Sequence, residues 1–347
     1  MNLDNFTVKG DCFFSVDEKN AIHDTSFYSL YIGLEQYFKT YNRVWFDLRK
    51  NDRSNVNRIN QTIQNNDRYI KSYVDIAIHI QHFFELEVKR ILRKLHPLFP
   101  DEIKDPILLN KLLNNIILSE EEISNVRSLE FSEAFSRLKK LVVKGIISDR
   151  VAVLFVNNEK LLTTFATMRN SIMHRGIKIL NYCSLDDLFS QNLFPLLLDL
   201  LNEPEYAEYK TEYDNLGIVS SIQDIVSEGS KSPVDYSRIA HLKEIARCKY
   251  ILDSKLCFSS ENETDIVDTL VCKQISFNQA TLLDDVCPCC GKKAVLAFHE
   301  VQRVDIEELG DETSIECGYQ TLMVPTYLDY YQCQWCDYTC TDFIVFS

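Results

Sequence analysis

Glycine, proline and tryptophan are scarce in this sequence, whose 347 residues include 9 glycines, 8 prolines and 2 tryptophans. Such low glycine and proline contents exclude collagen-like and low-complexity chains, which are rich in both residues. No apolar run approaches the roughly 18 residues that a membrane-spanning helix needs, so we expect no membrane partner. The first residues also lack the basic and then apolar pattern of a secretory signal, which predicts a cytoplasmic protein.

Three common enzyme motifs are missing as well. The sequence contains no Gly-x-x-x-x-Gly-Lys-Ser/Thr phosphate loop, no dinucleotide-binding Gly-x-Gly-x-x-Gly and no Gly-x-Ser-x-Gly nucleophile turn. Hydrophobic residues nevertheless make up 46% of the chain and charged residues 25%, as in globular proteins. The length predicts roughly two domains.

The net charge of −14 is distributed unevenly along the chain. Residues 1–180 hold 26 basic and 22 acidic side chains, a balance of +4, whereas residues 181–347 hold 11 and 29, a balance of −18. This acidic surplus argues against a protein that coats nucleic acid over its whole surface. A local anion-binding face in the first half remains compatible with these numbers.

Hydrophobic periodicity predicts a mainly α fold followed by a small β-rich domain. In the clearest predicted helix, residues 66–98, apolar side chains recur at steps of three and four, namely at Ile76, Ile80, Phe84, Val88, Ile91 and Leu95. A further helix is expected over 149–175, because Asp149 is a good N-terminal cap and Gly176 a natural stop. Alternating runs predict strands at 270–277, 294–301, 320–324, 327–332 and 343–346.

These patterns divide the chain into four expected segments. They are a mixed or helical extension over 1–65, a helical domain over 66–230, a linker or helix over 231–264, and a β-rich domain over 265–347.

Cysteine is abundant, and seven of the twelve cysteines lie between Cys287 and Cys340. Cys287 with Cys290 and Cys333 with Cys336 form two Cys-x-x-Cys pairs, separated by 42 residues. Two such turns let four thiolates approach one tetrahedral ion, which predicts a structural Zn²⁺ with no open position for water. Since no export signal is present, disulfides are not expected.

The segment Cys287-Pro288-Cys289-Cys290-Gly291 resembles the knuckle of a zinc ribbon, and the resemblance covers roughly residues 285–347. An iron–sulfur cluster remains an alternative, because Cys289 and Cys340 are also nearby in the sequence. A zinc ribbon by itself does not distinguish nucleic-acid binding from protein binding or simple stabilisation of the fold.

The most specific functional signal is the end of the helix predicted over 149–175, where Arg169 and Asn170 are followed by His174. An arginine fork suits phosphate oxygens, and a histidine exchanges protons near neutral pH. Asn170 and His174 share a helix face, whereas Arg169 and His174 are about 140° apart on an ideal helix. Fraying at Gly176, or a helix from a second copy, is needed for both to line one cleft, which motivates a homodimer.

These residues resemble the HEPN superfamily, whose active members carry an Arg-polar-x-x-x-His motif that Arg169, Asn170 and His174 match in order and spacing. The resemblance covers roughly residues 66–200. It implies a HEPN-like helical bundle that dimerises to form a metal-independent endoribonuclease site. Many members are toxins of toxin–antitoxin modules or abortive-infection effectors of antiphage defence. The predicted fold is therefore a HEPN-like helical bundle followed by a zinc ribbon.

Glu87 is a further candidate site residue, because it lies within the apolar face of the helix predicted over 66–98. A carboxylate on such a face needs a partner. It either positions Arg169 or pairs with Arg90 or Lys94 in its own helix. His79 and His82 lie off the apolar face and are expected at the surface.

Two functional hypotheses follow. The first is an endoribonuclease that acts as a toxin or antiphage effector, in which the 2′-hydroxyl of the RNA substrate attacks the phosphate. His174 is the general base or acid, Arg169 stabilises phosphate charge and Asn170 orients the scissile group. No cofactor takes part in catalysis. The second is a catalytically inactive HEPN-like and zinc-ribbon adaptor that binds a protein or nucleic-acid partner. An antitoxin or a phage protein is a possible partner in either case.

Overall fold

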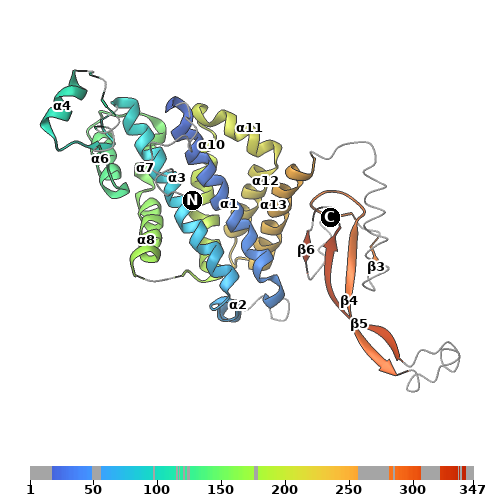
Figure 1. Cartoon of the computed structure of the whole chain (residues 1–347). Helices are drawn as coiled ribbons and strands as arrows, with labels where there is room; N and C mark the ends of the chain where they lie inside the picture. Colours follow the sequence, from blue (N-terminus) through green and yellow to red (C-terminus); the bar gives the residue numbers. More distant parts are fainter. Residues whose placement is uncertain are drawn as a thin grey trace, which may run out of the picture. The chain divides into compact units, whose positions relative to one another are not determined.

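The computed structural model describes residues 18–48, 56–96, 98–114, 116, 118–119, 122, 126–175, 179–256, 281–283, 286–305, 321–334, 336 and 338–340. The protein is mainly helical, with a few small antiparallel strands near the C-terminus (Figure 1). By compactness the chain forms two units, one of residues 1–36 and 73–179 and the other of residues 37–72 and 180–347.

The first half of the chain is built from helices and one small pair of strands. In order these are α1 (Glu18–Leu48), α2 (Val56–Ile63), α3 (Asp67–Leu95), β1 (Asp101–Glu102), α4 (Pro106–Leu113), β2 (Arg127–Ser128), α6 (Phe131–Val143), α7 (Arg150–Asn157) and α8 (Glu159–Arg175). Helices α1 and α3 contribute residues to both compact units.

The second half continues with helices and ends in a sheet. Its elements are α9 (Tyr182–Leu188), the π-helical turn η2 (Phe189–Leu193), α10 (Phe194–Leu201), the 3₁₀ turn η3 (Pro204–Tyr206), α11 (Ala207–Asn215), α12 (Ile218–Gly229), α13 (Tyr236–Leu256), β3 (Thr281–Leu282), β4 (Val295–Asp305), β5 (Thr321–Cys333) and β6 (Thr339–Cys340).

Helix α3 confirms the helix predicted over 66–98. Its N-terminus is capped by Asn66, whose Oδ1 accepts a hydrogen bond from the backbone N–H of Tyr69 at 2.9 Å. The apolar stripe lies in the core as expected, with Ile76, Ile80, Phe84, Val88 and Ile91 buried. Leu95 in the last turn is the exception, since it is 41% exposed.

In the first compact unit, α1 packs closely along α3. Phe27 lies edge-on to Phe83, with 5.7 Å between the ring centroids. The two backbones come so near at Gly33 that a Cβ placed there would lie 2.6 Å from Ile80 Cδ1. Glycine at this position therefore permits the close approach of the two helices.

The helix predicted over 149–175 is divided in two at Asn158. Asp149 caps α7 as expected, because its side chain accepts from the N–H of Ala152 at 3.0 Å. Both α7 and α8 are joined to α3 by aromatic contacts, since Phe84 meets Phe155 at 5.9 Å and Phe165 at 6.0 Å between ring centroids. Phe165 is one turn before Arg169, so this contact places the end of α8 beside α3.

The C-terminal strands form an antiparallel sheet in the order β3-β4-β5-β6. Strand β4 pairs with β5 from Val295 opposite Cys333 to Asp305 opposite Thr321, with irregularities after Phe298 and Glu300. The runs predicted at 320–324 and 327–332 are thus parts of one strand, while 270–277 and 343–346 lie outside the described residues. Register places the end of β5, with Cys333, beside the start of β4.

The helical part of the second unit contains a fully buried ion pair. Lys243 Nζ on α13 lies 2.7 Å from Asp186 Oδ1 on α9, and both side chains are 0% exposed. The ammonium group also lies 4.0 Å from the centroid of the Tyr182 ring, a cation–π contact. Burial lowers the pKa of Lys243 and raises the pKa of Asp186, while each partner's charge opposes that change.

Candidate functional site

The four cysteines predicted as metal ligands come together at one end of the sheet. Cys287 Sγ lies 3.6 Å from Cys336 Sγ, and Cys290 Sγ lies 3.6 Å from Cys333 Sγ. All four sulfur atoms are within 4.8 Å of one another. This group, which we call the thiolate cluster, could hold a metal ion.

Backbone geometry explains how each Cys-x-x-Cys pair turns its sulfurs inward. In the first knuckle the N–H of Gly291 donates to the carbonyl of Cys287 at 2.9 Å, and the N–H of Cys289 points to Cys287 Sγ at 3.4 Å. Gly291 has a φ of +70°, a left-handed conformation that favours glycine. In the second knuckle the N–H of Cys333 donates to the carbonyl of Tyr338 at 2.8 Å.

Hydrogen bonds between the sulfur atoms shift the pKa values of these cysteines in opposite directions. Hydrogen bonding from Cys287 lowers the pKa of Cys290, and hydrogen bonding to Cys290 raises the pKa of Cys287. A thiolate is the form that ligates metal, so an ion at the centre of the cluster would stabilise the deprotonated state of all four sulfurs.

Sequence reasoning missed one cysteine of this region altogether. Cys248 on α13 is fully buried, and its sulfur is within 4.8 Å of those of Cys289 and Cys336. Cys248 belongs to no Cys-x-x-Cys pair and precedes Cys287 by a long stretch of sequence, so no spacing pattern indicates it. Only the packing of α13 against the sheet brings it to the cluster.

The second candidate site is the end of α8, which we define as Arg169, Asn170 and His174. Arg169 is half-buried, while Asn170 and His174 are exposed. Arg169 Nη1 donates to Asn170 Oδ1 at 3.0 Å, so the asparagine holds the guanidinium group. Helix α8 continues to Arg175, hence it does not fray before His174, and Arg169 and His174 remain about 140° apart around its axis.

A histidine that sequence reasoning had placed at the surface is partly covered in the structure. His82 on α3 is half-buried, and its Nδ1 is 2.8 Å from the hydroxyl of Ser29 on α1. Burial lowers the pKa of His82, the charge of Glu85 partly offsets this, and the charges of His79, Lys89 and, least, Arg169 lower the pKa further.

His79 is also half-buried, which corrects the expectation that it lies at the surface. The signal that could have indicated both histidines is their spacing, because His79 and His82 are one turn apart beside the apolar stripe. The same face carries Glu85, which accepts from Lys89 Nζ at 2.7 Å and from Gln81 Nε2 at 3.0 Å. Burial alone would raise the pKa of Glu85, but these hydrogen bonds outweigh it and lower the pKa.

Glu87 has the local partner that was one of its two expected alternatives. Its carboxylate is fully buried and accepts from Arg90 Nη2 at 2.8 Å and from Ser26 Oγ at 2.5 Å. Among the residues that the structure describes, no ion pair joins Glu87 to Arg169. The arrangement therefore links α3 to α1 through Ser26, a contact that sequence reasoning did not anticipate.

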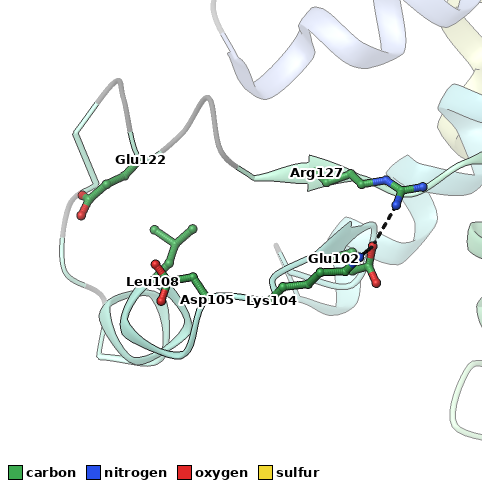
Figure 2. A pocket seen from close by; sticks show the side chains of 6 residues that line it. All are labelled: Glu102, Lys104, Asp105, Leu108, Glu122 and Arg127. Carbon is green, nitrogen blue, oxygen red and sulfur yellow. Dashed lines mark hydrogen bonds and ion pairs between the residues drawn. The ribbon is translucent and has the colours of Figure 1, made fainter.

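A pocket of about 320 Å³ lies elsewhere in the first unit, between α4 and the β1–β2 pair. Figure 2 shows Glu102 of β1 paired with Arg127 of β2, with Leu108 of α4, its N-terminal cap Asp105 and Glu122 around the opening. None of the predicted site residues lines this pocket.

No family model, no curated protein and no solved structure matches this chain. None of these comparisons therefore identifies the chain as a member of the HEPN superfamily. In the part of the chain that the structure describes, no helix combines the length and apolarity needed to traverse a bilayer.

Proposed function

We propose that the protein is a metal-independent endoribonuclease that acts at the α8 end. The supporting observation is that Arg169 Nη1 donates to Asn170 Oδ1 at 3.0 Å at the end of α8, where His174 is also exposed. RNA supplies its own nucleophile, the 2′-hydroxyl next to the scissile phosphate. The protein then has to supply a proton acceptor, a proton donor and a cation for the phosphate charge.

The chemistry assigns a role to each polar group of the site. A neutral imidazole removes the 2′-hydroxyl proton, and the oxygen attacks phosphorus as the bond to the 5′-oxygen breaks and that oxygen takes up a proton. Arg169 binds the phosphate oxygens, and Asn170 holds its guanidinium group in place. The products are a 2′,3′-cyclic phosphate and a 5′-hydroxyl. Toxicity to the host cell or restriction of phage would be the biological outcome.

Two histidines compete for the role of base, and they imply different assemblies. His82 is on α3, against which α8 packs in the same chain through Phe84 and Phe165, and burial lowers the pKa of His82. His174 is exposed on the other side of α8, so it would face an Arg169 supplied by a second copy of the chain. The homodimer expected from the sequence is required in the second case.

RNA cleavage in EDTA tests the proposal directly. Arg169→Ala, His174→Ala and His82→Ala are compared with wild type, and His96→Ala, an exposed histidine just after α3, is the matched control. Loss of a general acid or base typically reduces the rate by about 10²- to 10⁴-fold. The affected histidine identifies the base, whereas undiminished cleavage in all three variants would remove the α8 end from consideration.

Within the same proposal, the thiolate cluster holds Zn²⁺ as a structural ion. Four cysteine sulfurs complete a tetrahedral shell, which leaves no position for a water nucleophile. Cleavage should accordingly be insensitive to brief exposure to EDTA.

An adaptor without catalytic activity is the second candidate, and helix α4 favours it. Ile107, Leu109 and Leu113 of this helix are 68%, 37% and 63% exposed, and exposed apolar side chains that form a patch are typical of protein contacts. Together with the acidic second half of the chain, such side chains suit a protein partner. A wild type that leaves RNA intact and is harmless on overexpression would support this function instead.

A further inference from the structure

The thiolate cluster is not the whole set of sulfur atoms gathered in this region. Cys248, Cys289 and Cys336 form a second group whose sulfurs also lie within 4.8 Å of one another. Cys336 belongs to both groups. We propose that the protein binds a second thiophilic divalent ion, such as Zn²⁺, between these three sulfurs, with Cys336 as a thiolate that bridges the two ions.

The geometry carries this inference because the three sulfurs come from separate elements and yet converge. Cys248 is on α13, Cys289 is in the first knuckle and Cys336 is in the second. In a tetrahedral site with zinc–sulfur bonds of about 2.3 Å, neighbouring sulfurs are less than about 4 Å apart, so small movements suffice to bind an ion. Buried cysteines that only fill space have no need to place three sulfurs together.

Hydrogen bonds also hold the group in place. Arg247 Nη2 donates to Cys248 Sγ at 3.4 Å. The guanidinium group is itself held by Glu244, whose Oε2 accepts from Arg247 Nε at 2.8 Å and whose Oε1 accepts from Nη2 at 2.7 Å. Such support of a ligating sulfur by hydrogen bonds is common around metal sites.

Three sulfurs leave one position of a tetrahedral ion to another ligand. Glu244 Oε1 accepts from Cys248 Sγ at 4.0 Å, so a carboxylate oxygen lies at this side of the group. It also accepts from the backbone N–H of Thr339 in β6 at 3.1 Å, so it is fixed between the helix and the sheet. Water or this carboxylate would complete the coordination, in contrast to the closed shell of the first ion.

The second ion would have a structural consequence for the second unit. Cys289 Sγ is 3.7 Å from the carbonyl of Ile245, so the first knuckle already contacts α13. A metal ion bound by both Cys248 and Cys289 would add coordinate bonds that link the helix to the first knuckle. The ribbon would then be tied to α13 through metal in addition to apolar packing.

Metal counting on the purified full-length protein tests the inference. Zinc is measured per chain by elemental analysis and by native mass spectrometry, in wild type, Cys248→Ser and Cys289→Ser. We expect two ions in wild type and one in each variant. Cys183→Ser is the matched control, since Cys183 is a buried cysteine outside both groups, and it should retain two.

A spectroscopic measurement detects the bridge itself. In protein loaded with ¹¹³Cd, wild type should show two resonances that are scalar-coupled through Cys336, and Cys289→Ser should keep one of them. Cys289 is only partly buried, so this variant is informative even where Cys248→Ser does not fold.

The inference rests on the zinc site of the thiolate cluster but not on ribonuclease activity, and metal counting separates the outcomes. No zinc in wild type would overturn both metal sites. One ion in wild type, or two ions that persist in Cys248→Ser and Cys289→Ser, would overturn the second site alone. The RNA cleavage assay is independent of all these results.

Discussion

The thiolate cluster and the α8 end differ in how far their polar groups are exposed to solvent. The cluster collects its sulfurs from two Cys-x-x-Cys pairs in a buried place, where Cys287, Cys333 and Cys336 are nearly or completely inaccessible. The α8 end leaves Asn170 and His174 exposed to solvent. Burial suits a site whose ligands must exclude water, whereas exposure suits a site that must receive a large polymer such as RNA.

The two sites also differ in whether neighbours in the sequence or distant segments bring their side chains together. Each cysteine pair shares one turn, so the sequence itself places two sulfurs together. On α8, the regular helix keeps Arg169 and His174 about 140° apart, and the helix packs on α3 through Phe165. The spacing of a motif therefore brings side chains together in a tight turn, whereas in a helix it can keep them on different sides.

The largest expected effect is on the buried thiolate cluster. Cys333→Ser should abolish metal binding at the thiolate cluster and unfold the sheet, because structural zinc contributes apparent binding free energies of roughly 10 kcal/mol or more. Thermal unfolding with zinc analysis measures this, and prolonged chelation should reproduce it in wild type. A Cys333→Ser protein with unchanged metal content and melting temperature would contradict the prediction.

The control for that experiment is Cys183→Ser. Burial raises the pKa of Cys183 to about 12, so this thiol is neutral and serves as a small apolar side chain. We expect its substitution to leave the metal content unchanged.

A smaller effect is expected from the buried ion pair of the second unit. Lys243→Met leaves Asp186 buried without its cation, which should reduce the free energy of unfolding by about 3–5 kcal/mol. Adding Asp186→Leu removes the remaining charge and should recover much of the loss. Urea unfolding measures the free energy of unfolding of the two variants. A double variant as unstable as the single one would mean that the ion pair itself stabilises the fold, and that the unpaired charge of Asp186 is not the cause of the loss.

The smallest effect is expected near the α8 end and appears as a pH dependence. Because burial lowers the pKa of His82 below its unfolded value of about 6.5, the unfolded chain binds the proton first as the pH falls. Stability should therefore decrease below about pH 6.5, until the pH also falls below the pKa in the folded state. His82→Gln should reduce this slope by at most about 1.4 kcal/mol per pH unit.

Chemical unfolding between pH 7 and pH 5 measures the slope. The matched control is His96→Gln, at an exposed position. Equal changes of slope in both variants would mean that the environment of His82 is not the cause.

Local patterns in the sequence account for much of the fold. The apolar repeat of α3, the cap at Asp149 and the two Cys-x-x-Cys pairs are confirmed where the structure describes them. What these patterns did not indicate are contacts between distant segments. Glu87 meets Ser26 of α1, and His82 is half-buried because α1 covers it, and neither fact is contained in the periodicity of α3.

The amino-acid sequence alone determined which residues share a turn or a helix face, since these relations follow from the fixed geometry of the backbone. It thereby determined the long amphipathic helix and the pairing of cysteines within each knuckle. The tertiary structure decided that Cys248 joins Cys289 and Cys336, and that His82 is half-buried beside Ser29 of α1. Both depend on how helices pack, which is set by the summed burial of many side chains and not by the spacing of a few.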